Sequence, residues 1–352
     1  MLAILLAGLG QHSQRAAFDQ LRESATEGMT MKAYVISEPG GPEKLVLTNI
    51  DTPKVRPGWV LIKVRAFGLN RSEWFTRLGE SPSVKFPRVL GIECVGEVAD
   101  SLNPKFKKGQ KVAAIMGGMG RDFDGSYEEY VLAPEKIVFA VQTQLDWKVF
   151  GALPEMVQTT HGSLYQGLEI EKGQSLLIRG GTSSIGLCAL EMAKNAGLKV
   201  ISTTRSEAKM GSLKRLGASD VIVDKGEIAK EMRKNYPEGV DRVLELVGAG
   251  TLLDSLQTVK RGGVVCMTGG LGGQWEIEHF APMDAIPTAV KLTSYAGEAT
   301  DLTAEELQKY LDVVEKGEMK IRAGKTFSFS ELQEAHRLMD SNQADGKIVV
   351  TI

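Results

Sequence analysis

Residues 175–186 read Ser-Leu-Leu-Ile-Arg-Gly-Gly-Thr-Ser-Ser-Ile-Gly, an apolar run that leads into a turn rich in glycine and serine. The run over 175–179 has the length and composition of a buried strand, and 185–196 carries its apolar residues on one helical face. The alternation continues with a predicted helix at 209–216 and predicted strands at 199–204, 221–223, 242–247 and 263–267. Strands and helices that alternate in this way predict an α/β domain with a parallel sheet and right-handed crossovers.

The glycine turn lies where a doubly wound sheet binds the pyrophosphate of a dinucleotide. Backbone N–H groups of the turn and the N-terminus of the next helix offer positive potential to phosphate oxygens. We expect Gly181 to allow the tight turn and Gly186 to permit close packing of helix on strand. Ser183 replaces the middle glycine of the usual G-x-G-x-x-G pattern, and the hydroxyls of Ser183 and Ser184 can donate to the phosphates. An ordinary strand-to-helix turn is the alternative, because such turns also use glycine.

The end of the next predicted strand indicates which dinucleotide is bound. An NAD-preferring site places an Asp or Glu there, about 20 residues after the turn, to hold the ribose 2′-OH. This chain instead has two cations, Arg205 and Lys209, and two hydroxyls, Thr204 and Ser206. Such a set suits a 2′-phosphate, so NADPH is the predicted cofactor. The alternative is a solvated basic helix start that Ser206 caps.

Two later strands of the same predicted sheet also end in glycine, at Val247-Gly248 and Gly269-Gly270. Ligands bind beyond the carboxyl ends of parallel strands, so we expect these residues near the nicotinamide half of the cofactor. Ordinary turns would explain the same glycines.

Length and charge limit the classes of protein that fit. The 352 residues suggest about two domains at a prior of roughly 150 residues each. Forty-two basic and 44 acidic residues leave a net charge of −2, so neither nucleic acid nor a membrane surface is an expected partner. Three well-separated cysteines exclude a disulfide framework and favour a reducing, cytoplasmic setting.

The N-terminal part of the chain has a different pattern. Short predicted strands at 60–66, 89–98 and 111–116 are separated by glycine and proline, which predicts a β-rich, barrel-like domain over 31–150. Residues 1–30 contain an apolar run at Leu2–Gly10 that is too short to span a membrane. We interpret 1–30 as a poorly ordered leader, with a secretory signal as the less favoured alternative.

The C-terminal part does not continue the strand–helix rhythm. Helices are predicted at 303–316 and 331–341 and a final strand at 347–352. These elements are too few for a domain of their own. We therefore expect 293–352 to rejoin the N-terminal domain, which leaves 151–292 as the dinucleotide-binding domain.

An ordered set of motifs resembles the medium-chain dehydrogenase/reductase superfamily over residues 31–352. The motifs are Met31-Lys32-Ala33, Gly68-Leu69-Asn70-Arg71-Ser72-Glu73, Arg77-Leu78-Gly79, Leu90-Gly91-Ile92-Glu93-Cys94-Val95-Gly96-Glu97-Val98, Gly125-Ser126-Tyr127-Glu128-Glu129-Tyr130, the glycine turn, Glu334-Ala335-His336 and Gly346-Lys347-Ile348-Val349-Val350. Within the superfamily the chain is most similar to the zinc-free quinone oxidoreductase-like branch. The resemblance implies a GroES-like β-rich catalytic domain, a Rossmann domain with a doubly wound parallel sheet, and a cleft between them.

The resemblance also implies roles for three residues and an assembly state. By carry-over, Asn70 would lie beside the nicotinamide, Thr159 would touch its ribose, and Lys347 would approach the cofactor. Hydride transfer from the nicotinamide is the implied chemistry. A homodimer is a further implication.

The positions that hold zinc in metal-dependent relatives carry other residues here. A catalytic zinc site needs Cys, His and one further ligand, whereas the matching positions are Asn70, Ile92 and, by a looser alignment, Glu155. The four-cysteine structural site is absent too, because only Cys94 lies in that region. We therefore expect no metal. Without a Lewis acid, oxidation of an unactivated alcohol is disfavoured, and reduction of an already electrophilic acceptor fits better.

The predicted function is NADPH-dependent, zinc-free hydride transfer to a small electrophile, either a quinone or an activated alkene such as an α,β-unsaturated carbonyl. One alternative is an enoyl-thioester reductase, and the other is a non-catalytic NADPH-binding protein of the crystallin or sensor type. The predicted catalytic residue is Asn70. The predicted cofactor-binding residues are Gly181, Thr182, Ser183, Ser184, Ile185, Gly186, Thr204, Arg205, Ser206, Lys209, Thr159, Val247, Gly248, Gly269, Gly270 and Lys347.

Four other side chains near these motifs receive weaker interpretations. Trp74 and Phe75 would form an apolar wall for a planar acceptor, or else pack in the core. His161 and His336 have no partner identifiable from the sequence, and we expect both to be structural.

Overall fold

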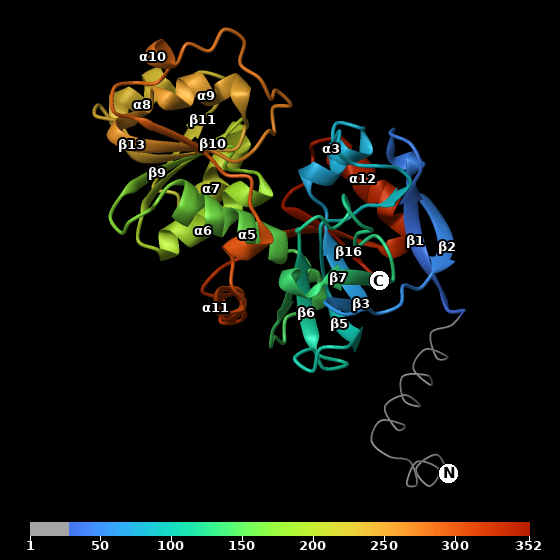
Figure 1. Ribbon diagram of the computed structural model, residues 1–352. Helices are drawn as coiled ribbons and strands as arrows, with labels where there is room; N and C mark the ends of the chain where they lie inside the picture. Colours follow the sequence, from blue (N-terminus) through green and yellow to red (C-terminus); the bar gives the residue numbers. More distant parts are fainter. Residues whose placement is uncertain (1–27) are drawn as a thin grey trace, which may run out of the picture.

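The computed structural model describes residues 28–352, so residues 1–27 of the predicted leader lie outside the described residues. Two lobes lie side by side (Figure 1). The first strand, β1 (Thr30–Ile36), begins one residue before the predicted start at Met31. Among the described residues, no helix combines the length and hydropathy that crossing a bilayer requires.

One lobe is built on a parallel sheet whose strands have the order β11-β10-β9-β12-β13-β14. Counted from β9, this is the 3-2-1-4-5-6 order of a doubly wound sheet, so the predicted Rossmann domain is confirmed. The strands are β9 (Ser175–Arg179), β10 (Lys199–Thr204), β11 (Asp220–Val223), β12 (Val240–Glu245), β13 (Val259–Met267) and β14 (Lys291–Ser294). The helices of this lobe are α6 (Ser184–Asn195), α7 (Met210–Leu216), α8 (Ala229–Asn235), α9 (Ala249–Leu256) and α10 (Pro282–Ala285).

Three boundaries in this lobe differ from the predicted ones. β12 ends at Glu245 rather than at 247, because the Glu245 carboxylate accepts hydrogen bonds from the N–H groups of Val247 (2.7 Å) and Gly248 (3.0 Å) and so bends the chain toward α9. β13 starts at Val259, since the glycines around Gly262 form an irregularity inside the strand rather than a turn before it. The sheet also continues to Ser294, two residues past the predicted domain limit at 292.

The other lobe holds a seven-stranded sheet with the path β15-β16-β3-β5-β6-β8, on which β7 pairs with β3, and a three-stranded sheet β2-β1-β4. Its further strands are β2 (Val46–Asp51), β3 (Trp59–Gly68), β4 (Arg88–Val89), β5 (Glu93–Ser101), β6 (Lys111–Ile115), β7 (Tyr130–Pro134), β8 (Val138–Ala140), β15 (Ala323–Ser328) and β16 (Lys347–Thr351). Its helices are α3 (Arg71–Arg77), α4 (Trp147–Phe150) and α12 (Leu332–Asp340). The C-terminal strand β16 pairs with β3, so both ends of the chain contribute to this lobe (Figure 1).

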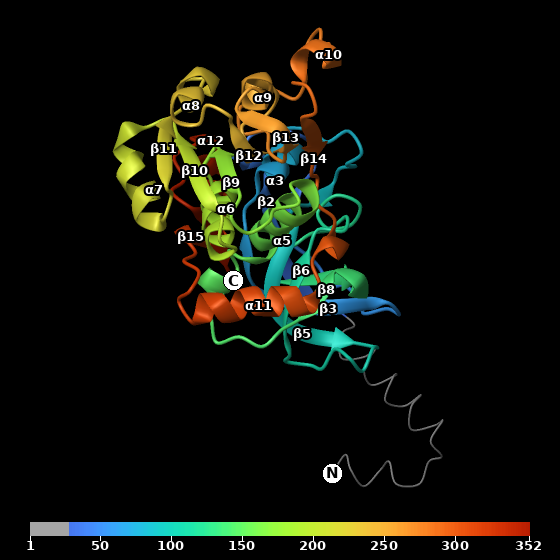
Figure 2. The same ribbon diagram turned by 90° about the vertical axis from the view of Figure 1, so that its left-hand side faces the viewer.

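The two lobes are joined through α5 (Pro154–Gly162) and α11 (Ala304–Glu315). One buried apolar cluster extends from Val95 of β5 through Val157 of α5 to Leu190 of α6. α11 lies against both α5 and β8 (Figure 2). The lobes therefore share a core, and the position of α5 between them matters for the site described below.

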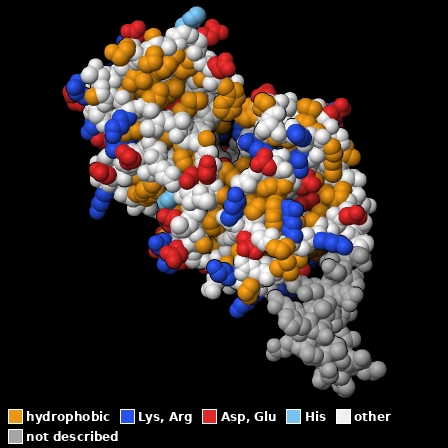
Figure 3. Space-filling view, viewed as in Figure 1, with side chains coloured by type: hydrophobic (Ala, Val, Ile, Leu, Met, Phe, Trp, Pro, Cys, Tyr) orange, Lys and Arg blue, Asp and Glu red, His pale blue; other side chains and the backbone are white. Residues whose placement is uncertain are grey.

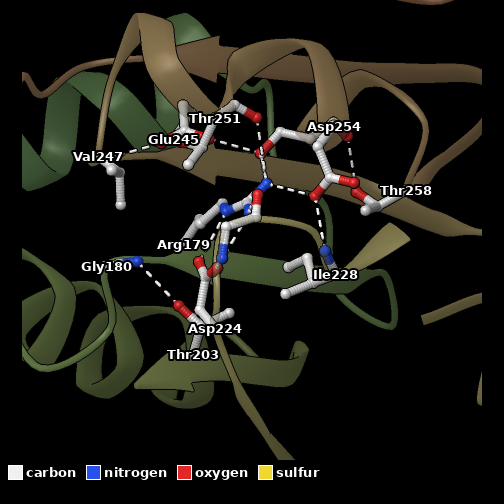
Figure 4. A network of polar contacts seen from close by, with 12 residues as sticks. Arg179, Gly180, Thr203, Asp224, Ile228, Glu245, Val247, Thr251, Asp254 and Thr258 are labelled. Atoms are coloured by element: carbon white, nitrogen blue, oxygen red, sulfur yellow. Dashed lines mark hydrogen bonds and ion pairs between the residues drawn. The ribbon is translucent and has the colours of Figure 1, made fainter. Parts of the chain in front are cut away.

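Arg179, the last residue of β9, is fully buried at the carboxyl edge of the parallel sheet (Figure 4). Its Nε and Nη2 donate to the two oxygens of Asp224 at 2.8 and 3.1 Å, and its Nη1 donates to Asp254 at 2.7 Å. The remaining acceptors are the carbonyl oxygens of Thr251 and Gly226 and the hydroxyl of Ser255. One guanidinium thus ties together β9, the segment after β11, and α9.

Replacement of Arg179 should destabilise the protein strongly. Arg179→Met would leave Asp224 and Asp254 without their cation, and a broken buried ion pair costs about 3–5 kcal/mol. The matched control is Arg65→Met, since Arg65 pairs with Glu97 at 2.6 Å where both side chains are about one-third exposed, and such pairs contribute about 0–1 kcal/mol. Chemical unfolding followed by circular dichroism measures both variants. Equal losses of stability would contradict the structural role of Arg179.

A second buried polar chain crosses the GroES-like lobe. The Tyr127 hydroxyl donates to Glu73 Oε2 at 2.8 Å and lies 2.9 Å from Nε2 of His336. Because the single hydroxyl proton is directed at Glu73, Nε2 of His336 must carry the proton of the other bond. Nδ1 of His336 is buried without a partner, and burial together with nearby Arg77 lowers the pKa of His336 to about 3. His336 is therefore a neutral, buried structural residue, as expected.

His336 should make the free energy of unfolding depend on pH in the acidic range. The unfolded pKa of histidine is about 6.5, so between there and pH 3 the unfolded chain binds a proton that the folded protein does not. The contribution of His336 to the free energy of unfolding is fully present above pH 6.5 and is lost as the pH falls. Between pH 6.5 and 4.5 this loss amounts to about 2–3 kcal/mol. His336→Gln keeps a donor for Tyr127 and should lose less stability over that range, whereas His279→Gln, at an exposed position, should behave as wild type. Unfolding free energies at the two pH values test this, and a wild-type slope in His336→Gln would contradict it.

Candidate functional site

A cleft of about 280 Å³ lies where the lobes meet. Figure 3 shows one face of the molecule, on which the surface is hollowed between the lobes. The Rossmann lobe contributes the ends of β9, β10 and β11 to its wall, and the GroES-like lobe contributes segments beside α3 and β16. Eight of the predicted cofactor-binding residues line this first cleft: Thr182, Ser183, Ser184, Thr204, Arg205, Lys209, Val247 and Lys347. The predicted cofactor-binding residues that follow different strands are thus brought together at the carboxyl edge of the sheet.

The glycines of the turn are used differently from the prediction. Gly180, not Gly181, has the left-handed conformation, with φ +89°. A Cβ on Gly181 would lie 1.9 Å from the Ser202 hydroxyl, so this glycine is needed for close approach to β10. A Cβ on Gly186 would lie 2.5 Å from the carbonyl oxygen of Gly180, which agrees with its expected role in packing helix on strand.

Ser183 contributes to the turn rather than offering a free donor. Its hydroxyl donates to the Gly180 carbonyl at 2.7 Å and accepts from the Gly186 N–H at 3.0 Å as the N-cap of α6. Donation from Ser183 to a phosphate would require its hydroxyl to turn away from the Gly180 carbonyl, and it stays a prediction. A serine at the N-cap satisfies the helix start and the tight turn before any ligand arrives.

The charged residues that line the first cleft are mainly cations. Arg71, Arg205, Lys209 and Lys347 face a single carboxylate among its described lining residues, that of Asp224. Burial raises the pKa of Asp224, but the hydrogen bonds from Arg179 outweigh it and lower that pKa below its usual value. Since both Asp224 oxygens are already hydrogen-bonded to Arg179, the cleft presents a net positive surface suited to phosphate groups.

A second cleft of about 530 Å³ lies beyond the ends of β13 and β14. Thr268 and Tyr295, the residues that follow these two strands, line it together with Glu155 and Thr159 of α5. Its apolar wall comes from the GroES-like lobe and includes Ile92. Thr159, implied by the resemblance to contact the ribose, therefore lies in this second cleft and not in the first.

Lys347 connects the two clefts. Its side chain is 2% exposed, and its Nζ lies 2.9 Å from Glu93 Oε1 and 3.1 Å from Glu155 Oε2, and it also donates to Asn70 Oδ1. Burial lowers the pKa of Lys347, but the two carboxylates raise it above the ordinary value, so the ammonium stays charged. Lys347 lines the first cleft and Glu155 the second, which places one ion cluster between them.

Asn70 lines neither cleft. Its amide nitrogen donates to Glu93 at 3.0 Å, its oxygen accepts from Lys347, and its backbone N–H donates to Glu73 at 2.8 Å at the start of α3. In this conformation Asn70 is a buried residue that orients the ion cluster. Asn70 is absent from the lining of both clefts, and its implied place beside the nicotinamide stays a prediction.

Several other predicted residues are absent from the lining of both clefts. They are Gly181, Ile185, Gly186, Ser206, Gly248, Gly269 and Gly270. Most of these are packing positions: a Cβ on Gly269 would lie 2.4 Å from the Leu246 carbonyl oxygen, and one on Gly270 would meet the Trp275 ring at 2.7 Å. The residues directly after them, Leu271 and Gly272, line the first cleft instead.

Trp74 and Phe75 also face away from both clefts. The Trp74 indole N–H donates to Asp340 at 2.6 Å, and Phe75 packs edge-on against Trp275 with ring centroids 4.9 Å apart. Phe75 is buried, so the core alternative holds for this residue. Phe75 and Trp275 form a contact between the lobes.

The sequence prediction missed several lining residues. Thr203 is the penultimate residue of β10 and Asp224 directly follows β11, and the rule that ligands bind at carboxyl strand ends would have found both. Arg71 and Asn342, which are hydrogen-bonded to each other, come from the other lobe. No spacing in the sequence signals that these two residues meet the Rossmann turn.

Comparisons with known proteins agree with this architecture. The family described as "Alcohol dehydrogenase GroES-like domain" matches residues 56–143, and "Zinc-binding dehydrogenase" matches 216–350. Quinone oxidoreductase of Homo sapiens is 28% identical over 343 residues, covering 93% of this chain and 100% of the relative. The 2-methylene-furan-3-one reductase of Solanum lycopersicum is 29% identical over 353 residues, covering 96% and 83%. The structure of the quinone oxidoreductase from Coxiella burnetii has a TM-score of 0.78 at 26% identity and covers 92% of this chain and 100% of that one.

One family description names zinc, and the residues at the corresponding positions do not fit that ion. Glu155 accepts from Lys347 and Thr159, Asn70 is held by Glu93 and Lys347, and Ile92 has no ligand atom. No group of three or more His, Cys, Asp or Glu side chains is arranged to hold a metal within residues 28–352. With a GroES-like lobe, a Rossmann lobe and matches along nearly the whole described chain, this protein belongs to the medium-chain dehydrogenase/reductase superfamily, in which it is quinone oxidoreductase-like.

Proposed function

We propose that the protein is an NADPH-dependent reductase that transfers hydride to a quinone or an activated alkene without a metal ion. The observation that carries the proposal is the cationic first cleft, which reaches the second cleft through a buried lysine rather than a metal site. The names of two relatives, a quinone oxidoreductase and a 2-methylene-furan-3-one reductase, support the two acceptor classes.

The residues of the first cleft suit a phosphorylated dinucleotide. The turn after β9 and the start of α6 would hold the pyrophosphate through backbone N–H groups. Arg205, Lys209 and the Thr204 hydroxyl would hold the 2′-phosphate, because all three line the cleft near the end of β10. Both Asp224 oxygens accept from Arg179, which reduces the negative charge that this side chain presents to a phosphate.

The second cleft holds groups suited to deliver a proton. NADPH supplies a hydride when it is bound, and reduction of the acceptor also requires one proton. The Thr159 hydroxyl donates to Glu155 at 2.8 Å, and the other Glu155 oxygen accepts from Lys347. A hydroxyl, a carboxylate and an ammonium therefore form one hydrogen-bonded line that ends at the cleft, and we assign it the role of a proton route.

Cofactor preference should depend on the two cations after β10. Arg205→Ala combined with Lys209→Ala should raise the Michaelis constant for NADPH about tenfold or more, because each charge-assisted hydrogen bond contributes about 1.5–3 kcal/mol. The constant for NADH should change little, since NADH lacks the 2′-phosphate. Lys214→Ala, an exposed lysine of α7 outside the cleft, is the control. Equal effects on the two cofactors would refute the 2′-phosphate assignment.

Acceptor choice and metal independence can be measured together. Oxidation of NADPH should be rapid with simple quinones or enones, slow with enoyl thioesters, absent with ethanol and NADP⁺, and unchanged by prior treatment with a strong zinc chelator. Inactivation by chelator, with recovery on adding zinc, would overturn the metal-free mechanism. Tight NADPH binding without turnover of any acceptor would indicate the non-catalytic alternative.

A further inference from the structure

The second cleft contains two cations to which the proposed reaction assigns no role. Arg121, in the loop after β6, and Lys136, in the short turn before β8, both line it. Arg121 is half-buried and Lys136 is exposed. Neither side chain makes an ion pair or hydrogen bond with any other described residue.

The two carboxylates of the same cleft form no pair with these cations. Glu155 accepts from Lys347 and Thr159, and Glu298 is exposed. Arg121 and Lys136 are therefore both without a partner among the described lining residues. An arriving anion would find two cations available.

The Nε atom of Arg121 is a buried donor without a partner. This atom is shielded from solvent and has no hydrogen-bond partner. Leaving a buried donor of a charged group without a partner is unfavourable, and a bound carboxylate would supply that partner.

The loop that carries Arg121 is held in an unusual backbone conformation. Met116, Gly117 and Gly118 have φ values of +50°, +62° and +95° in succession, and all three line the second cleft. The Gly118 carbonyl accepts from the N–H groups of Arg121 (3.1 Å) and Asp122 (2.8 Å), which closes the loop. A left-handed conformation at a non-glycine residue such as Met116 is costly and is concentrated at functional sites.

The rest of the cleft wall is apolar and suits the body of an unsaturated acceptor. Ile92, Met119 and Ile137 line it together with the hydroxyl of Thr159. An apolar wall with a few placed polar groups is the usual composition of a small-molecule site. The two cations would then select among acceptors that share the same reactive group.

We propose that the natural acceptor of this enzyme carries an anionic group, a carboxylate or a group of similar charge, and that Arg121 with Lys136 binds it. The inference rests on the proposed reductase function and specifies its substrate class. Arg121 supplies the directed, partly desolvated contact. Lys136, being exposed, contributes mainly long-range attraction that salt will screen.

The test uses pairs of acceptors that differ only in charge. Two suitable pairs are (E)-6-oxohept-4-enoate with its methyl ester, and a benzoquinone that bears a propanoate chain with its methyl ester. Two methylene groups insulate the charge from the reactive group, so the acids and esters have similar intrinsic reactivity. Wild-type enzyme with NADPH should favour each acid over its ester by about tenfold or more in kcat/KM, as one charge-assisted contact predicts.

Substitutions of Arg121 and Lys136 test whether these residues cause the preference for acids over esters. Arg121→Gln should lower kcat/KM for the acids about tenfold and leave the esters within about twofold, with Arg121→Lys between the two. Lys136→Gln should cause a smaller loss that disappears at high salt. Lys105→Gln, an exposed lysine outside both clefts, should behave as wild type. Equal losses for acids and esters in Arg121→Gln would overturn the proposal.

A binding measurement separates failure of this inference from failure of the proposed function. The saturated acid 6-oxoheptanoate and its methyl ester need no turnover, and calorimetry should show tighter binding of the acid to the NADPH-loaded protein, lost in Arg121→Gln. Turnover of both esters and acids without preference overturns the anion site and leaves the reductase function intact. Absence of all turnover overturns the reductase function, and the calorimetric difference then decides the anion site alone.

Discussion

A single buried ammonium, that of Lys347, constrains the arrangement of the whole candidate site. A charge with 2% exposure is tolerated only when opposite charges surround it, and here Glu93 of β5 and Glu155 of α5 do so within 3.1 Å. Asn70 completes the cluster from the start of α3. Three elements of the GroES-like lobe and the helix that joins the lobes must therefore meet at one point, and the two clefts open on either side of it.

Arg179 in the other lobe is also a buried cation paired with two carboxylates. Its guanidinium forms ion pairs with Asp224 and Asp254 at the sheet edge, so the negative charge of the carboxylate that lines the first cleft is partly compensated. Lys347 lies between the clefts and Arg179 lies behind one of them. One cluster thus belongs to the wall of the site, and the other holds the strands that build it. The positive surface offered to a phosphorylated ligand depends on both.

Local pattern predicted the Rossmann lobe well and its turn less well. Parallel strands buried on both faces appear as short apolar runs, so β9 and β10 match the predicted residues 175–179 and 199–204. The strand that ends at Glu245 was placed too late, because a buried carboxylate bends the chain there and apolarity does not report that bend. The left-handed conformation of Gly180 was not predicted, because Gly180 and Gly181 differ only in what packs against each.

The sequence by itself determined the two lobe types, the parallel sheet and the cationic end of β10, because strand periodicity, glycine turns and neighbouring charges are properties of short segments. Only the tertiary structure decided that Lys347 meets Glu155, 192 positions earlier in the chain, and that Asn70 is turned into this cluster and away from both clefts. It alone brought Arg121 and Lys136 to one cleft and paired Glu155 of that cleft with Lys347. Contacts between distant segments arise from how sheets and helices pack, and packing leaves no periodic signal in the chain that could have predicted them.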